Sequence, residues 1–318
     1  MKKFPLLLLT LVSLLVMSCE SEESTSAIVD DFKLLTVTSE GKIFKIGNNT
    51  GNTENIGQIA NQSNLIMLST ICNVGSTIYA LEASYVPAPN RLIIYNKTNN
   101  TTTTQQIILP ASLSSTMLDP FITNIEYNGT ELIAIVSENM PDNSHPNKII
   151  TINLQNYQTT DLNIAFYQRS LASTELINDK LYVSTRTEGL LKIDLTLNTV
   201  TELQANATRI NATRLVKVSN SKLGLMKFGY PEFVNGVKPF EFDLTNNSLI
   251  DKSQGAVFAV GNTSGGTVFY NDEYLNLVFN TNSSLGILKM NYNSNVTNFV
   301  PLNQSILGSN TTIIGITN

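Results

Sequence analysis

The chain has 318 residues, a formal net charge of −5 at pH 7 and only 14% charged side chains. A mildly acidic chain lacks the basic surface that binds nucleic acid, so we expect no nucleic-acid partner. Its polarity comes instead from 39 asparagines and 35 threonines, residue types that favour turns and solvent-facing strand positions over helix surfaces.

The first 18 residues have the pattern of a secretory signal. Lys2 and Lys3 precede an apolar run over residues 4–17, which is too short to span a bilayer, and a small residue, Ser18, stands before Cys19. Cleavage before Cys19 would leave 300 residues and, because two lysines are lost, change the formal charge from −5 to −7. Only Cys72 would then be free to pair, so no intramolecular disulfide is expected.

The stretch Leu15-Val16-Met17-Ser18-Cys19 resembles the lipobox of bacterial lipoproteins, although Met17 is bulkier than usual at its position. The resemblance implies that Cys19 is acylated and that residues 1–18 are removed, which would attach the protein to a membrane through its N-terminus. The alternative is an ordinary secretory signal with an incidental cysteine.

Residues 19–32 are expected to form a tether. The run Glu20-Ser21-Glu22-Glu23 and the Ser/Thr stretch up to Ala27 contain nothing to bury. The acidic run also resembles the signal that sends some lipoproteins of Gram-negative bacteria to the cell surface. We therefore expect an outer-membrane lipoprotein, with the cell surface favoured over the periplasmic face.

A short phrase recurs six times after the tether: two or three apolar residues, often a Lys or Thr, another apolar residue, and then Asp, Asn or Gly. The turn residues that close the six phrases stand between 41 and 57 residues apart. The phrases cover residues 43–47, 92–96, 149–153, 190–194, 239–243 and 287–291.

Each phrase is preceded by apolar stretches with strand composition and followed by a Thr-rich segment such as 101–108 or 199–203. The stretches directly before the phrases are 34–39, 77–83, 131–137, 180–185, 222–228 and 274–279. A further stretch precedes five of these, at 65–74, 121–127, 171–177, 212–218 and either 256–260 or 266–270. Helical periodicity is absent from residue 19 onward, which argues against a βα repeat.

Four antiparallel strands per unit of about fifty residues resemble the β-propeller domains of secreted bacterial proteins over residues 33–318. The first unit lacks its inner strand, and a spare apolar segment at 312–316 could supply it beside 34–39 and so close the ring. We therefore predict an all-β, six-bladed propeller, with seven blades as the alternative and two stacked sandwiches as a less regular one. The single Gly265-Gly266 pair and the absence of tryptophan match no repeat signature, so the resemblance assigns no site residue.

Strand alternation gathers the connections between second and third strands and those between blades on one face. Long connections there carry aromatic and basic residues, a composition typical of recognition surfaces, although ordinary turns with shielding aromatics are the alternative. The predicted ligand-binding residues are Tyr85, Arg91, His145, Tyr167, Arg169, Tyr230 and Phe233.

No catalytic constellation is found in the sequence. His145 is the only histidine, no Gly-x-Ser-x-Gly elbow occurs, and neither a transition-metal set nor a calcium loop is present. Glu126 and Glu175 are the acidic residues of the predicted inner strands, and we expect both to be strand-end charges facing solvent. Cys72 should be a buried apolar residue.

These observations favour a lipid-anchored, non-catalytic binding or scaffolding module with a protein or glycan ligand and no cofactor or metal. The alternative is a propeller hydrolase or lactonase that uses a divalent ion in the central channel.

Overall fold

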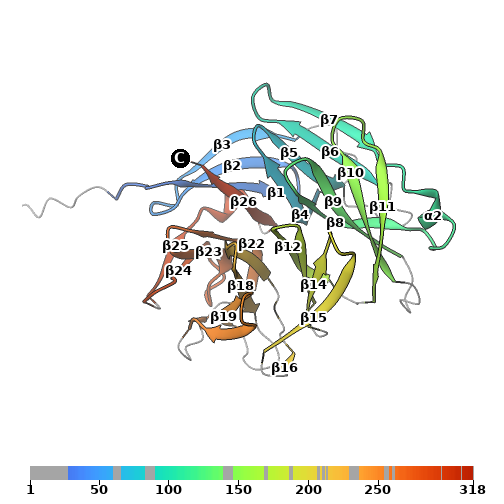
Figure 1. The fold of residues 1–318 in the computed structure, drawn as a ribbon. Helices are drawn as coiled ribbons and strands as arrows, with labels where there is room; N and C mark the ends of the chain where they lie inside the picture. The colour runs from blue at the N-terminus through green and yellow to red at the C-terminus, as the bar shows by residue number, and fades with distance from the viewer. Residues whose placement is uncertain are drawn as a thin grey trace, which may run out of the picture.

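The computed structural model describes residues 28–317 except for 60–65, 83–89, 139–145, 168–170, 186–188, 206–207, 210–211, 213, 229–235, 254–257, 260–261, 295 and 309. These residues form six antiparallel sheets arranged as the blades of a β-propeller (Figure 1). The prediction of an all-β propeller with six blades is confirmed. Among the described residues no helix is long and apolar enough to cross a membrane.

The blades follow one another along the chain, and the strands of each blade are named from the inner to the outer one. Blade 1 is β26 (Thr311–Thr317), β1 (Lys33–Thr38), β2 (Lys42–Gly47) and β3 (Thr53–Gln58). Blade 2 is β4 (Ile66–Val74), β5 (Thr77–Glu82), β6 (Arg91–Asn96) and β7 (Thr101–Gln106). Blade 3 is β8 (Phe121–Tyr127), β9 (Glu131–Ser137), β10 (Asn147–Asn153) and β11 (Thr159–Phe166).

Blades 4 and 5 each carry one strand more than the four expected, and it is two residues long. Blade 4 is β12 (Leu171–Ile177), β13 (Lys180–Thr185), β14 (Leu190–Asp194), β15 (Thr199–Ala205) and β16 (Thr208–Arg209). Blade 5 is β17 (Arg214–Ser219), β18 (Lys222–Phe228), β19 (Gly236–Asp243) and β20 (Ser248–Asp251), with β21 (Phe258–Ala259) also on β19. Blade 6 is β22 (Asn262–Tyr270), β23 (Glu273–Phe279), β24 (Leu285–Asn291) and β25 (Thr297–Pro301).

The recurring phrase forms the third strand of every blade, as predicted. Its apolar residues are buried on both faces of the sheet because each blade is packed between two others. In β2, for example, Ile43 packs toward blade 2 and Phe44 toward blade 6. The buried apolar side chains accordingly form six clusters, one between each pair of neighbouring blades.

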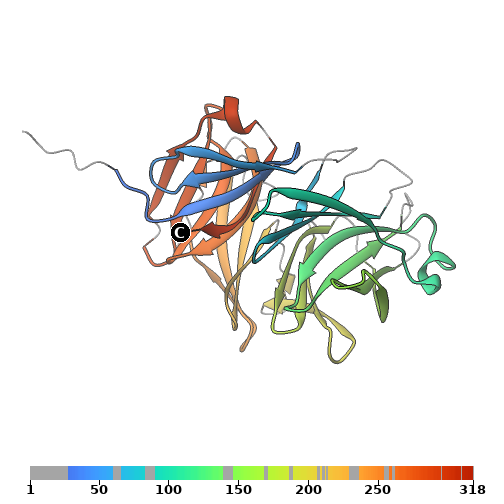
Figure 2. The same cartoon turned by 90° about the horizontal axis from the view of Figure 1, so that it is seen from above.

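The C-terminal strand β26 closes the ring as the sequence predicts. It pairs antiparallel with β1, with Val37 opposite Thr312, and the red β26 lies beside the blue β1 in both views (Figures 1 and 2). Each inner strand also contacts the inner strands of both neighbouring blades, so the inner ring is continuous.

The Gly265-Gly266 pair lies against the closing strand β26, and the structure explains why glycine is needed there. Gly266 has a φ of +68°, and a Cβ on it would lie 2.6 Å from the backbone nitrogen of Ile313 in β26. The two glycines therefore let β22 approach β26 more closely than any side chain would allow. Of the two segments predicted for the inner strand of blade 6, the second is correct. Residues 266–270 belong to β22, whereas 258–259 pair with β19 in blade 5.

In the described part of the chain, two helices of one turn each interrupt the strands, and the sequence did not predict them. They are α2 (Ala111–Ser114), between blades 2 and 3, and α3 (Gln304–Leu307), before β26. Each contributes one buried leucine, Leu113 or Leu307, to an interface between blades.

Candidate functional site

The strand order defines two faces of the propeller. The loop face carries the connections from second to third strands and those between blades, and the turn face carries the turns from third to fourth strands. Of the seven predicted ligand-binding residues, Arg91 and Tyr167 are described, and strand order assigns both to the loop face. The other five, Tyr85, His145, Arg169, Tyr230 and Phe233, lie outside the described residues, and so do Cys19 and the signal segment.

Arg91 is held in place by a buried carboxylate that sequence reasoning missed. It is the first residue of β6, and its Nη1 lies 3.0 Å from Oε2 of Glu82, whose side chain is fully buried. Next to it, the Asn90 side chain accepts a hydrogen bond from the Ile122 amide at 2.8 Å and donates to the Pro120 carbonyl at 3.2 Å. Arg91 thus presents a positioned guanidinium, one third exposed, at the junction of blades 2 and 3.

Two further features belong to the loop face. Buried Glu138, just after β9, accepts a hydrogen bond from the Leu118 amide and so joins blade 3 to its incoming connection. Tyr167, just after β11, is 72% exposed. A solvated tyrosine and an arginine fixed by an ion pair are residue types that often dominate binding energy at interfaces.

Glu126 and Glu175 are not free strand-end charges in solvent, as the sequence-based expectation had them, because each is bonded to a neighbouring blade. Both lie on inner strands, β8 and β12, and both are only partly exposed. The Thr174 hydroxyl of blade 4 donates to Oε1 of Glu126 in blade 3 at 2.6 Å. Glu175 accepts a hydrogen bond from the Lys217 amide of blade 5. The two carboxyls therefore link successive inner strands.

Burial makes ionisation of this pair unfavourable. Burial raises the pKa of Glu126 to about 7, against the lowering effect of the Thr174 hydrogen bond. Burial and then the charge of Glu126 raise the pKa of Glu175 to about 8, against the effects of Lys217. The pair is therefore best described as two interacting carboxyls that take up their protons in two successive steps near neutral pH.

The described residues around the centre of the ring bear on whether a divalent ion could be held there. Among the described residues no group of three or more His, Cys, Asp or Glu side chains is close enough to hold one. Glu175 also has the cationic Lys217 near it, and Cys72 is buried, with its Sγ donating to the Ile125 carbonyl at 3.3 Å. The expectation that Cys72 is a buried apolar residue is confirmed.

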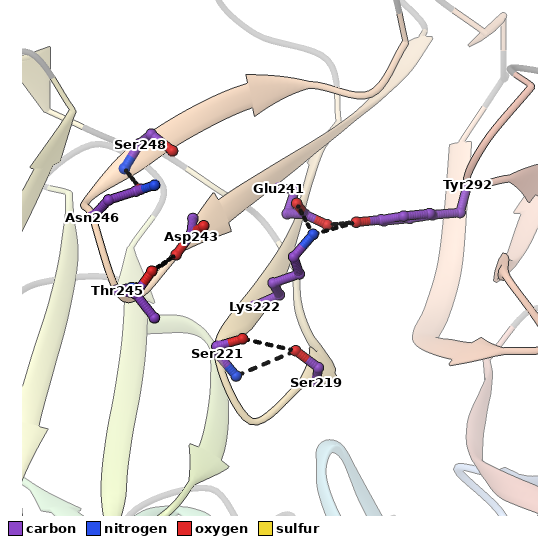
Figure 3. Close-up of polar contacts among 9 residues, drawn as sticks. All are labelled: Ser219, Ser221, Lys222, Glu241, Asp243, Thr245, Asn246, Ser248 and Tyr292. Carbon is purple, nitrogen blue, oxygen red and sulfur yellow. Dashed lines mark hydrogen bonds and ion pairs between the residues drawn. The ribbon is translucent and has the colours of Figure 1, made fainter.

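A second polar cluster joins blades 5 and 6 on the turn face. Glu241 in β19 is buried, and both Lys222 of blade 5 and Tyr292 of blade 6 point at its carboxylate (Figure 3). Lys222 Nζ lies 2.9 Å from Glu241 Oε1, and the Tyr292 hydroxyl donates to Oε2. Lys252 Nζ lies 3.6 Å from the centre of the Tyr292 ring. This cluster is a bridge between blades.

The comparisons with known proteins concern the fold. No known family and no curated protein matches the sequence. Among solved structures, TolB from Acinetobacter baumannii superimposes with a TM-score of 0.58 at 9% identity, over 88% of this chain and 65% of TolB. A puromycin hydrolase mutant gives a TM-score of 0.49 at 10% identity, over 83% of this chain and 42% of the hydrolase. The chain thus spans less than two thirds of the length of either protein, and the likeness to TolB shows the β-propeller fold.

Proposed function

We propose that the protein is a lipid-anchored β-propeller of the cell envelope whose loop face is a non-catalytic binding or scaffolding surface for a protein or glycan ligand. The observation that carries the proposal is Arg91, fixed by the buried Glu82 on the same face as the exposed Tyr167. A positioned guanidinium loses less side-chain entropy on binding than a free one. The cell surface of an outer membrane is the location we favour, from the acidic run after Cys19.

The anchor is tested by replacing Cys19. We expect Cys19→Ser to abolish fatty-acid labelling and to release the protein from the membrane fraction, because no other residue is proposed to carry lipid. Replacing Glu20, Glu22 and Glu23 with Ala tests the sorting role separately, through protease accessibility in intact cells. Fatty-acid labelling that persists in Cys19→Ser would refute the lipobox interpretation.

The binding surface is tested with two mild substitutions. The full chain carrying Cys19→Ser is screened against a glycan array and immobilised envelope proteins. We expect Tyr167→Ala to weaken binding of the ligand found by roughly tenfold, a typical loss for an interface tyrosine. Arg91→Lys keeps a cation beside Glu82 but loses the planar guanidinium, so it should weaken binding while the protein stays folded.

Leu197→Ala is the matched control, since Leu197 is 70% exposed on the turn face. Equal affinity of the wild type, Tyr167→Ala and Arg91→Lys would move the site away from this part of the loop face.

The Glu126–Glu175 pair is the one observation that favours the hydrolase alternative. Because the described part of the chain places only these two carboxyls together there, we expect calcium to leave the melting temperature unchanged. A calcium-dependent rise that disappears in Glu126→Gln would instead favour a divalent-ion enzyme.

A further inference from the structure

The turn between third and fourth strands has the same construction in blades 2 to 6. The last residue of the third strand is Asn or Asp, and its side-chain oxygen accepts hydrogen bonds from the amides two and three residues later. Asn96, for example, accepts from Thr98 at 2.8 Å and from Asn99 at 3.4 Å. Figure 3 shows the Asp243–Thr245 contact of blade 5. The residues that cap their own turns are Asn96, Asn153, Asp194, Asp243 and Asn291.

Blade 1 breaks this rule, because Gly47 stands at the capping position. The amides two and three residues later, those of Asn49 and Thr50, are instead bonded to Oδ1 of Asp30, at 2.9 and 2.8 Å. The Thr50 hydroxyl donates to Oδ2 of Asp30 at 2.7 Å. Asp30 precedes β1 and belongs to the segment that leads from the N-terminus, so the cap of this turn is supplied from outside it.

This arrangement needs glycine at position 47 because a side chain there would clash with Asp30, and not because the backbone adopts a conformation that favours glycine. A Cβ on Gly47 would lie 2.1 Å from Oδ2 of Asp30, and Gly47 is not among the residues with positive φ. A side chain at position 47 and the carboxylate of Asp30 therefore compete for one volume. The turn itself is otherwise of the common kind, since Gly51 and its counterpart Asn100 both have positive φ, at 69° and 55°.

Neighbouring side chains hold the rest of the segment. Asn48 Oδ1 accepts from the amides of Asp31 at 3.0 Å and Phe32 at 3.3 Å. Asn49 Nδ2 donates to the Val29 carbonyl at 2.9 Å. Phe32 is buried, with its ring 4.8 Å from the Tyr270 ring of blade 6 in an edge-on arrangement. Residues 29–32 are thus attached to blades 1 and 6 at the point where the ring closes.

We propose that the β2–β3 turn of blade 1 is a docking site for the N-terminal segment. Gly47 has no side chain, and the carboxylate of Asp30 occupies the space that this leaves. Docking then holds the turn face toward the membrane. The orientation of the turn face toward the membrane rests on the proposed lipid anchor. The docking of Asp30 at the turn does not depend on that anchor. Eleven residue steps separate Cys19 from Asp30, so the chain between them spans at most roughly 40 Å. The turn face, and not the loop face, is then the one that carries the attachment to the bilayer, within roughly 40 Å of it.

The docking site is tested by amide exchange at Asn49 and Thr50 in the full chain. We expect Asp30→Ala and Gly47→Ala each to speed exchange roughly tenfold, because both leave these amides without an acceptor. Gly47→Asp should exchange like the wild type, since the new carboxylate caps the turn as in the other blades. For the same reason, Asp30→Ala should have no effect in the Gly47→Asp background.

Asn96→Ala in blade 2 is the matched control. It should speed exchange at Thr98 and Asn99, whose amides it caps, and leave Asn49 and Thr50 unchanged. Equal exchange rates in Gly47→Ala and Gly47→Asp, or an unchanged rate in Asp30→Ala, would overturn the docking site.

The orientation is tested with acylated protein on vesicles of phosphatidylethanolamine and phosphatidylglycerol that carry an acceptor-labelled lipid. A donor dye is placed on Leu197→Cys for the turn face or on Tyr167→Cys for the loop face, while the buried Cys72 stays unlabelled. We expect greater energy transfer from position 197 than from 167, and a smaller difference in Gly47→Ala. Equal transfer on bound protein would overturn the orientation but leave the docking site standing. Failure to bind vesicles at all would overturn the lipid anchor and the orientation together.

Discussion

Removing residues 311–317 will abolish cooperative folding of the whole propeller. β26 supplies the inner strand of blade 1, pairs with β1 along its length and contacts β22 and β4 on either side. Thr311, Thr312 and Ile313 are buried in it. Its loss would expose the edge of β1 and the apolar cluster that blade 1 and blade 6 share. We expect the free energy lost with these contacts to exceed the roughly 5–15 kcal/mol by which a domain is stable. Calorimetry and near-UV circular dichroism measure the result.

The control for this deletion is the missing strand itself. A synthetic peptide of residues 310–318 added to the truncated chain should restore the melting transition, because the pairing partner β1 is still present. A truncated chain that melts in one transition within a few degrees of the wild type would show that the ring does not depend on β26.

Stability will fall as the pH rises from 5 to 8, and the Glu126–Glu175 pair will cause much of the fall. In the folded protein these carboxyls titrate near 7 and 8, against an ordinary value of 4.5. Because their pKa is raised by folding, their contribution is fully present below 4.5 and is lost as the pH rises through 7 and 8. The double variant Glu126→Gln/Glu175→Gln should flatten this dependence and stabilise the protein at pH 8 by about 2 kcal/mol, which raises the melting temperature by roughly 3 °C.

The exposed Glu40 provides the control, and Glu40→Gln should leave the pH dependence unchanged. Carboxyls whose pKa is lowered act in the opposite sense. For Asp30, burial raises the pKa, but the hydrogen bonds from Thr50 and Asn49 outweigh it and lower the pKa overall. Its contribution is therefore lost only when the pH falls through that lowered pKa. A melting temperature that rises from pH 5 to 8 in the wild type would contradict the assignment of the glutamate pair.

The fold was predictable because each blade repeats one local pattern. An apolar third strand that ends in Asn, Asp or Gly is a short-range signal, and the closing role of 312–316 followed from the missing strand of the first unit. The sequence shows a Lys, Thr or Glu two residues before the turn in most phrases, but the contacts that such a residue makes with another blade have no local signal. In blade 6 this residue is Lys289, which reaches Asn49 of blade 1 at 2.7 Å, and in blade 5 it is Glu241, which reaches Tyr292 of blade 6.

The features of the candidate site and of the N-terminal docking site depend on pairs that are distant in sequence or in the ring. The role of Asp30 and Gly47 can be recognised only by comparison with the other blades, where the Asn or Asp that ends the third strand caps the turn. Glu126 and Glu175 lie 49 positions apart and meet because β8 and β12 are neighbours in the inner ring. Glu82 could have been found, since it ends a strand of otherwise apolar character and lies across the hairpin from Arg91.

Site-specific photo-cross-linking in living cells tests most directly the claim that the loop face recognises a ligand. A photoreactive phenylalanine analogue replaces Tyr167 on the loop face in one strain and Leu197 on the turn face in another, two positions of nearly equal exposure. We predict one discrete cross-linked partner from position 167 that is reduced by Arg91→Lys, and none from position 197. The same partner captured from position 197, or no partner from position 167, would contradict the account.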